Sequence, residues 1–275
     1  MEKTNKKILP ILTNNIVQIV IVVIFIAAAY VIGSLWTKVQ ILEKGGSKIA
    51  QVTVNPTGTN QPPAQPKIEM AQVKDAFNKA VIKFGDANRK LIALEISDPS
   101  CPYCQIAGGK NKEVSSQAGD QFKLVADGGT YVPPVPELKK LVDQGKTSFA
   151  LVYTPGHGNG EMGMKALYCA FEKGKFWEAD DLIMSNAGYN LMNNTVKNDK
   201  SQSGVVADFL KSAVDPTFMK SCLDSGKYDK QLSTDQSLAS GLGINGTPGF
   251  FINTTVFAGA YSFKDMQSTV DSALK

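Results

Sequence analysis

Hydrophobic positions divide the chain into an apolar N-terminal stretch, a polar segment and a longer region of helix and strand patterns. Residues 16–36 carry no charged side chain, and Trp36 stands at their far end. About 20 apolar residues, each rising 1.5 Å, match a hydrocarbon core about 30 Å thick. The pattern predicts one transmembrane helix over 16–36, preceded by a short cytoplasmic tail over 1–15.

A cleaved secretory signal is the alternative interpretation of this segment, because the alanines at 27–29 could host a cleavage site. They fall inside an apolar stretch that is longer than a usual signal core, which favours an uncleaved anchor. Lysines flank both ends, so the positive-inside rule nearly ties. The short tail and the large C-terminal region favour a single-pass protein of the cell membrane, with its N-terminus inside and its domain extracytoplasmic.

The polar segment over 37–66 predicts a flexible linker. Its residues 45–66 are rich in Gly, Pro, Thr, Asn and Gln, a composition that favours an extended chain. The remaining region, 67–275, is long enough to bury a core of its own.

This C-terminal region begins with alternating helix and strand patterns. Apolar residues at helical spacing predict a helix over 70–84 that ends at Gly85. Nearly continuous apolar runs predict buried strands at 91–96 and 147–153. The Gly-, Ser- and Pro-rich residues between them predict little beyond a short strand at 122–126 and a short helix at 136–142.

A block of helices then separates the second strand from the third. Two short strands are predicted at 250–253 and 255–258, and a last helix at 262–274. Five helices in a row do not fit simple α/β alternation, so we expect a small sheet interrupted by a helical insertion over about 159–240. The helices of this block are predicted at 161–173, 176–184, 204–214, 216–223 and 228–239.

Composition narrows the chemistry mainly through cysteine. The net charge of +4 over 275 residues is small and dispersed, so nucleic-acid binding has no particular support. Of the four cysteines, only Cys101 and Cys104 are close in sequence. Because His157 is the only histidine, the usual Cys/His zinc arrangements lack ligands. We therefore expect neither a metal nor a cofactor.

The pair Cys101 and Cys104 follows the first predicted strand and opens a helix, with Pro102 in its first turn, where a missing N–H costs nothing. Unpaired N–H groups and the helix dipole favour a thiolate at such a position. Cys101 is then the exposed attacking thiol and Cys104 the resolving thiol. A structural disulfide or two reduced core cysteines are the alternatives.

An acidic residue and a proline reduce the weight of those alternatives. Glu95 interrupts an apolar strand, where a buried carboxylate is costly; we expect proton exchange with Cys104 and a pKa raised by desolvation. A solvated Glu95 at a sheet edge is the alternative, and Asp98 is expected to be exposed. Pro248 leads into a strand and could be cis, which would leave the backbone of Thr247 free to pair with a substrate; an ordinary trans turn is the alternative.

The remaining candidates are less specific. Cys169 and Cys222 lie on different predicted helices, and we favour a structural disulfide between them over two buried free thiols. A cationic His157 near the dithiol would favour a thiolate, although a lone loop histidine is more often solvated. Pro102 and Tyr103, between the two thiols, are expected to contact substrate together with Thr247 and Pro248.

Residues 95–104, 166–177 and 246–251 together resemble the DsbA-like branch of the thioredoxin superfamily. The resemblance covers roughly 70–275 and implies an α/β thioredoxin fold with an inserted helical domain. It assigns the nucleophile, resolving thiol, buried acid and cis-proline to Cys101, Cys104, Glu95 and Pro248. Two features depart from that branch: the stretch 108–135 is long, and the Pro-Tyr dipeptide also occurs in reducing glutaredoxin-like proteins.

The expected function is extracytoplasmic thiol:disulfide exchange that introduces disulfides into exported proteins. The expected partners are exported cysteine-containing proteins and a membrane redox partner that reoxidises the dithiol. Two alternatives stay open. The protein could be a disulfide reductase or isomerase, or a tethered peptide-binding module whose thiols are only structural.

Overall fold

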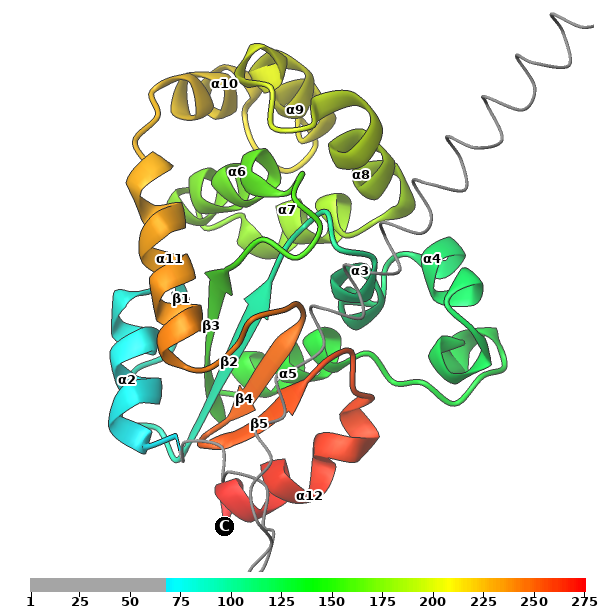
Figure 1. Cartoon of the computed structure of the whole chain (residues 1–275), viewed down its shortest axis with the longest axis vertical. Coiled ribbons are helices and arrows are strands. Elements are labelled where there is room, and N and C mark those ends of the chain that lie inside the picture. The colour runs from blue at the N-terminus through cyan, green and yellow to red at the C-terminus, as the bar shows by residue number, and fades with distance from the viewer. Residues whose placement is uncertain (1–67) are drawn as a thin grey trace, which may run out of the picture. The chain divides into compact units, whose positions relative to one another are not determined.

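The computed structural model describes residues 68–275, in which helices surround one mixed sheet (Figure 1). The anchor expected over 16–36 and the linker expected over 37–66 lie outside these residues. Within 68–275, no helix combines the length and apolar character needed to cross a bilayer. In chain order the elements are α2 (Met70–Lys79), β1 (Ile82–Phe84), β2 (Leu91–Ser97), α3 (Pro102–Gly108), α4 (Lys112–Gln117), the 3₁₀ turns η1 (Asp120–Phe122) and η2 (Val125–Asp127), α5 (Pro134–Asp143), β3 (Thr147–Tyr153), α6 (Glu161–Glu172), α7 (Phe176–Ile183), α8 (Asn186–Asn190), the π-helical segment η3 (Leu191–Val196), the 3₁₀ turn η4 (Lys200–Gln202), α9 (Ser203–Phe209), α10 (Pro216–Asp224), α11 (Asp229–Gly241), β4 (Gly249–Ile252), β5 (Thr255–Ala258) and α12 (Phe263–Leu274).

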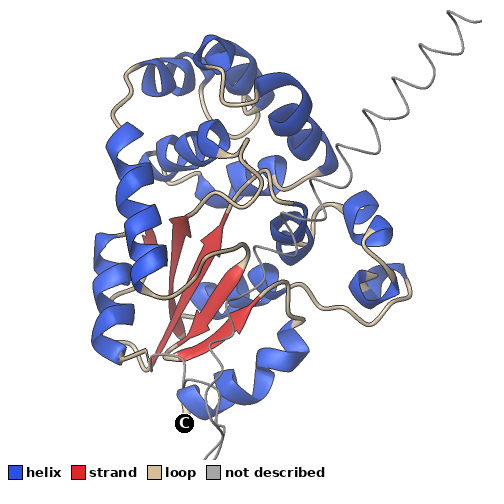
Figure 2. Cartoon of the chain, viewed as in Figure 1, coloured by secondary structure: helices blue, strands red, loops and turns tan. Residues whose placement is uncertain are grey.

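The five strands lie in the order β1-β3-β2-β4-β5 (Figure 2). The two central strands, β2 and β3, are parallel, and the others pair antiparallel with their neighbours. Every residue of β2 and β3 is buried, as their continuous apolar sequences predict. The strands expected at 91–96, 147–153 and 255–258 are confirmed.

Helices cover both faces of the sheet. Because side chains alternate along a strand, Ile92, Leu94 and Ile96 of β2 pack on one face with apolar residues of α2 and α11. Leu91 and Ala93 point to the opposite face, into a core shared with α5, α12 and the helices that follow β3. These later helices, α6 to α10, lie together beyond one end of the sheet (Figure 1).

The helix predicted over 70–84 is shorter than expected. α2 ends at Lys79, and Ala80 takes an extended conformation. The next residues form β1, in which Ile82 is buried and pairs with Leu151 of β3. The apolar spacing was compatible with either structure, and pairing with a strand almost 70 residues away decides for β1.

The strand predicted at 122–126 is wrong. Residues 122–126 lie in and between two 3₁₀ turns, and their extended part is limited to one bridge between Leu124 and Tyr131. Gly128 has a φ of 82°, so the chain turns back before a ladder can form. The sequence pattern also missed α8 and η3, which contain four asparagines, a residue of low helix propensity.

Cys169 of α6 and Cys222 of α10 form a disulfide, as predicted, across a sequence separation of 53 residues. Both cysteines are buried in the core that the helical insertion shares with the sheet. The bond therefore ties the first long helix of the insertion to one of its last.

Replacing both cysteines with serine should lower the free energy of unfolding by about 4 kcal/mol, because an open loop of this length has more unfolded conformations. Urea unfolding of the purified protein measures this difference. Ser221→Ala, at the exposed neighbour of Cys222, is the matched control and should change little. An unchanged midpoint in the double variant would contradict the prediction.

Candidate active site: a dithiol at the start of α3

The two closely spaced cysteines are free thiols at the beginning of α3. Cys101 is the N-cap residue in extended conformation, and Pro102 occupies the first turn, as the sequence predicts. Cys101 is only 5% exposed, so the expectation of an exposed attacking thiol is wrong. Its Sγ donates to the carbonyl oxygen of Thr247 at 3.5 Å, which shows that the loop before β4 covers it.

The pKa of Cys101 is lowered from 9.0 to about 6. The largest cause is the thiol of Cys104, which donates to the Cys101 thiolate; smaller contributions come from the Thr247 hydroxyl and the N–H groups of Cys104 and Tyr103, while burial acts in the opposite direction. From the sequence, the helix N-terminus, and a cationic His157 if it lay nearby, were expected to lower this pKa. The partner thiol is the largest cause, and the backbone N–H groups at the helix end contribute less.

Cys104 has the opposite character. Burial raises its pKa well above 9.0, and the nearby Cys101 thiolate raises it further. Its Sγ accepts the N–H of Asp98 at 3.4 Å. At neutral pH, Cys101 is therefore the nucleophile and Cys104 holds the proton, which is the division of labour that dithiol exchange needs.

Glu95 is 3% exposed, in the middle of the central strand β2. It pairs with Leu151 on one side and Phe250 on the other, so the edge-strand alternative is wrong. Burial raises its pKa to about 7. A carboxyl group that titrates near neutrality can both accept and return a proton.

A second buried acid, Asp180 of α7, interacts electrostatically with Glu95. Burial raises the pKa of Asp180, and the charge of Glu95 raises it further. The sequence reasoning missed this residue. The available signal was helical spacing, since Asp180 lies on the same face of α7 as the buried Phe176 and Ile183.

Asp98 is fully buried, which contradicts the expectation that it is exposed. Its carboxylate accepts the backbone N–H groups of Ser100, Gly156 and His157, each at 2.8 Å. These donors satisfy the charge without solvent. His157 thus meets the site through its backbone, whereas the residue itself is exposed, as expected of a solvated loop histidine.

Thr247 and Pro248 lie beside Cys101, as the sequence predicts. The peptide bond between them is cis. Pro248 is buried, and its carbonyl oxygen accepts the N–H of Gly259 at 2.8 Å. While Cys101 is a thiol, Thr247 Oγ1 is buried and has no hydrogen-bond partner among residues 68–275; the contribution of its hydroxyl to the Cys101 pKa is to the thiolate.

Tyr103, between the two thiols, is 47% exposed. Its ring packs edge-on against Phe122 at 5.7 Å, and Phe122 packs against Tyr131 at 5.6 Å. The long stretch after α3 therefore supplies an aromatic wall beside the dithiol. Phe122 and Tyr131 could not be assigned from sequence because their contacts depend on the turns η1 and η2.

The family model described as thioredoxin matches residues 135–272, about half of the chain. The chain belongs to the thioredoxin family. The matched residues include Thr247 and Pro248 and end short of the C-terminus, whereas Cys101 and Cys104 precede them. In the folded domain, the dithiol lies against the matched part, because Cys101 contacts Thr247. No curated protein matches the sequence.

Solved structures show the same fold. Oxidised BdbD from Bacillus subtilis is 17% identical, with a TM-score of 0.53 over 72% of this chain and 94% of that one. The α-DsbA1 protein of Wolbachia pipientis is 18% identical, with a TM-score of 0.51 over 70% of this chain and 89% of that one. The predicted DsbA-like thioredoxin fold is confirmed.

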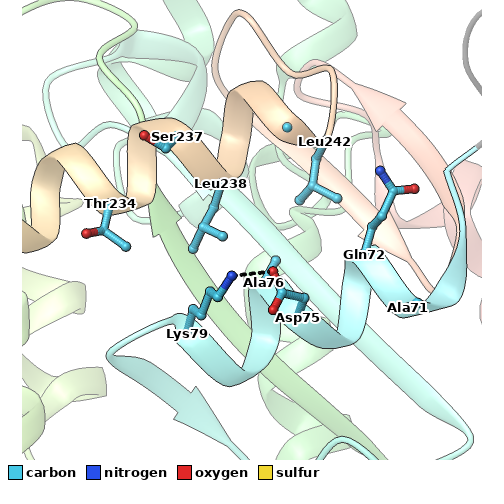
Figure 3. Close-up of a pocket in the computed structure, with 10 residues that line it drawn as sticks. Ala71, Gln72, Asp75, Ala76, Lys79, Thr234, Ser237, Leu238 and Leu242 are labelled. Atoms are coloured by element: carbon cyan, nitrogen blue, oxygen red, sulfur yellow. Dashed lines mark hydrogen bonds and ion pairs between the residues drawn. The ribbon is translucent and has the colours of Figure 1, made fainter.

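A groove of about 640 Å³ lies elsewhere on the thioredoxin domain, between α2 and α11 (Figure 3). Leu238 and Leu242 of α11 extend toward α2, on which Lys79 and Asp75 form an ion pair at 2.7 Å. None of the ten lining residues belongs to the segments around Cys101, Glu95 or Thr247. The exchange chemistry is therefore centred on the dithiol surface rather than on this groove.

Glu95→Gln should stabilise the protein at pH 8 by up to about 3 kcal/mol and leave it unchanged at pH 4. Folding raises the Glu95 pKa from 4.5 to about 7, so the stability that the neutral carboxyl gives below pH 4.5 is lost as the pH rises through 7. Urea unfolding at both pH values measures the effect. The exposed Glu113→Gln is the control; an equal difference between wild type and Glu95→Gln at the two pH values would contradict the assignment.

Proposed function

We propose that this protein is an extracytoplasmic thiol:disulfide oxidoreductase that introduces disulfides into exported proteins. The observation that carries the proposal is the paired arrangement of Cys101 and Cys104, one thiol acidified to a pKa of about 6 and the other buried and protonated. A purely structural pair gains nothing from such a difference.

The exchange starts from the Cys101–Cys104 disulfide. A substrate thiolate attacks Cys101 Sγ and forms a mixed disulfide, while Cys104 leaves as a thiolate and takes up a proton. The second substrate thiolate then attacks the sulfur of the first substrate cysteine in the mixed disulfide, and Cys101 is released as a thiolate. The substrate loses two electrons and its two cysteines become bonded, and the enzyme gains the two electrons as a dithiol.

Glu95 is proposed to supply the proton that Cys104 takes up and to accept it again on reoxidation. Its pKa of about 7 suits both directions. Thr247 and Pro248, with Pro102 and the exposed ring of Tyr103, are proposed to hold an extended segment of the substrate over Cys101. Mobile or unfolded chains suit such a surface because their backbones are still free to pair.

The direction of electron flow follows from the stability of the thiolate. A lowered Cys101 pKa stabilises the reduced enzyme, so its disulfide becomes a stronger oxidant. A pKa of about 6 lies between values of about 7 for thioredoxin and about 3.5 for DsbA. We therefore favour oxidation of substrates over reduction or isomerisation.

The location is part of the proposal. The uncharged residues 16–36 support a membrane anchor, and the Cys169–Cys222 disulfide supports an oxidising compartment. An enzyme that leaves each cycle reduced needs a membrane partner to accept its electrons. That partner and the exported substrates would meet the same exposed surface around Cys101.

The reduction potential of the Cys101–Cys104 pair should lie between about −270 mV and about −120 mV, the values of thioredoxin and DsbA. Redox titration against glutathione, followed by alkylation and mass spectrometry, measures it. A value at or below that of thioredoxin would favour the reductase alternative and overturn the oxidase assignment.

Cys101→Ser should abolish oxidation of a reduced, unfolded protein. Cys104→Ser has no disulfide to transfer, but when offered a substrate that carries a disulfide, its Cys101 thiolate should attack one sulfur, release the other as a thiolate and remain as a mixed disulfide. The reason is that only Cys101 is acidified. Non-reducing gels and a refolding assay follow both outcomes. If the Cys101 variant keeps full activity, or the wild type has none, the peptide-binding alternative gains and the enzymatic proposal fails.

A further inference from the structure

The loop between β3 and α6, residues 154–160, touches both halves of the dithiol site although it contributes no reactive group. On one side, its backbone N–H groups at Gly156, His157 and Gly158 point at the buried carboxylate of Asp98. On the other side, the α-carbon of Gly156 lies so close to Thr247 that an added methyl group would overlap Oγ1. The loop is thus held between Asp98 and Thr247.

Asp98 is the fixed point of this arrangement. Its Oδ1 accepts hydrogen bonds from both the N–H and the hydroxyl of Ser100, at 2.8 and 2.7 Å. Its Oδ2 accepts the backbone N–H of Gly156 in the loop. Gly160 packs against the same carboxylate so closely that a side chain at this position would overlap it. A buried carboxylate with this many donors is costly to disturb, so it holds the loop and the turn before Cys101 in one geometry.

Thr247 Oγ1 has no hydrogen bond to orient it in the dithiol form among residues 68–275. Gly156 packs against this hydroxyl group and limits where it can lie. We propose that Asp98 and Gly156 are positioning residues, which press the Thr247 hydroxyl toward Cys101 so that it can donate to the thiolate. The inference rests on the proposed function only in that it concerns the same sulfur.

The test is the pH dependence of alkylation of Cys101 by iodoacetamide in the full-length protein, read peptide by peptide by mass spectrometry. Gly156→Ala adds a methyl group where Thr247 Oγ1 lies. Losing one hydrogen bond to a charged sulfur should raise the Cys101 pKa by about one unit, or lower the thiolate fraction near pH 6 several-fold. Gly241→Ala, with open space around its α-carbon, is the control.

A double-variant cycle separates this effect from a general disturbance. In a Thr247→Ala background the hydroxyl is absent, so Gly156→Ala should cause no further shift. Cys104, which hydrogen-bonds to Cys101, and Tyr189, whose pKa responds to the charge of Cys101, are present in every variant, so their effects cancel. A shift of the same size in both backgrounds, or no shift with Thr247 intact, would overturn the proposal.

Asp98→Asn is examined in the same two backgrounds. Removing the negative charge acts on Cys101 equally whether or not Thr247 has a hydroxyl, so the difference between the two shifts isolates the part transmitted through the loop. We expect that difference to match the one for Gly156→Ala in sign; a zero or opposite difference would remove Asp98 from the proposal. Because alkylation needs no protein substrate, an inactive enzyme would defeat the proposed function and leave this test intact.

Discussion

The pairing of β2 is the constraint on which the site depends. β2 runs parallel to β3 and antiparallel to β4, with Ser97 opposite Tyr153 and Ile96 opposite Gly249. The ends of β2 and β3 and the start of β4 therefore meet at one edge of the sheet. Three segments that are far apart in sequence, 98–101, 154–160 and 247–248, converge there on Cys101.

Burial in this central strand also creates the chemistry. The strand that brings the segments together removes Glu95 from water and raises its pKa to about 7. Burial of Cys104 keeps its proton in place, and that proton stabilises the Cys101 thiolate. Loss of solvent therefore keeps Cys104 protonated and makes Glu95 titrate near neutrality. The Cys104 proton in turn acidifies Cys101, although burial of that sulfur acts in the opposite direction.

The helical insertion also forms hydrogen bonds with the segment that carries the dithiol. Asn193 of η3 donates to the carbonyl oxygen of Ser100 at 3.1 Å, and Gln105 of α3 donates to the carbonyl oxygen of Ile183 in α7 at 3.1 Å. The insertion is thus hydrogen-bonded to residues before and after the first thiol, Ser100 and Gln105. A disulfide that stabilises the insertion, between Cys169 and Cys222, supports the site at a distance.

The sequence alone was enough to identify the main groups of the dithiol site. The spacing of Cys101 and Cys104, the carboxyl of Glu95 within an apolar strand and the proline before β4 each predict their surroundings, because strand alternation, helix capping and proline geometry act over a few residues. Tertiary contacts decided the rest. Asp98 is buried only because loop 156–158 folds over it, β1 forms only because β3 is beside it, and Phe122 meets Tyr103 only through the turns after α4. Those outcomes depend on donors and partners supplied from distant parts of the chain, which a local pattern cannot specify.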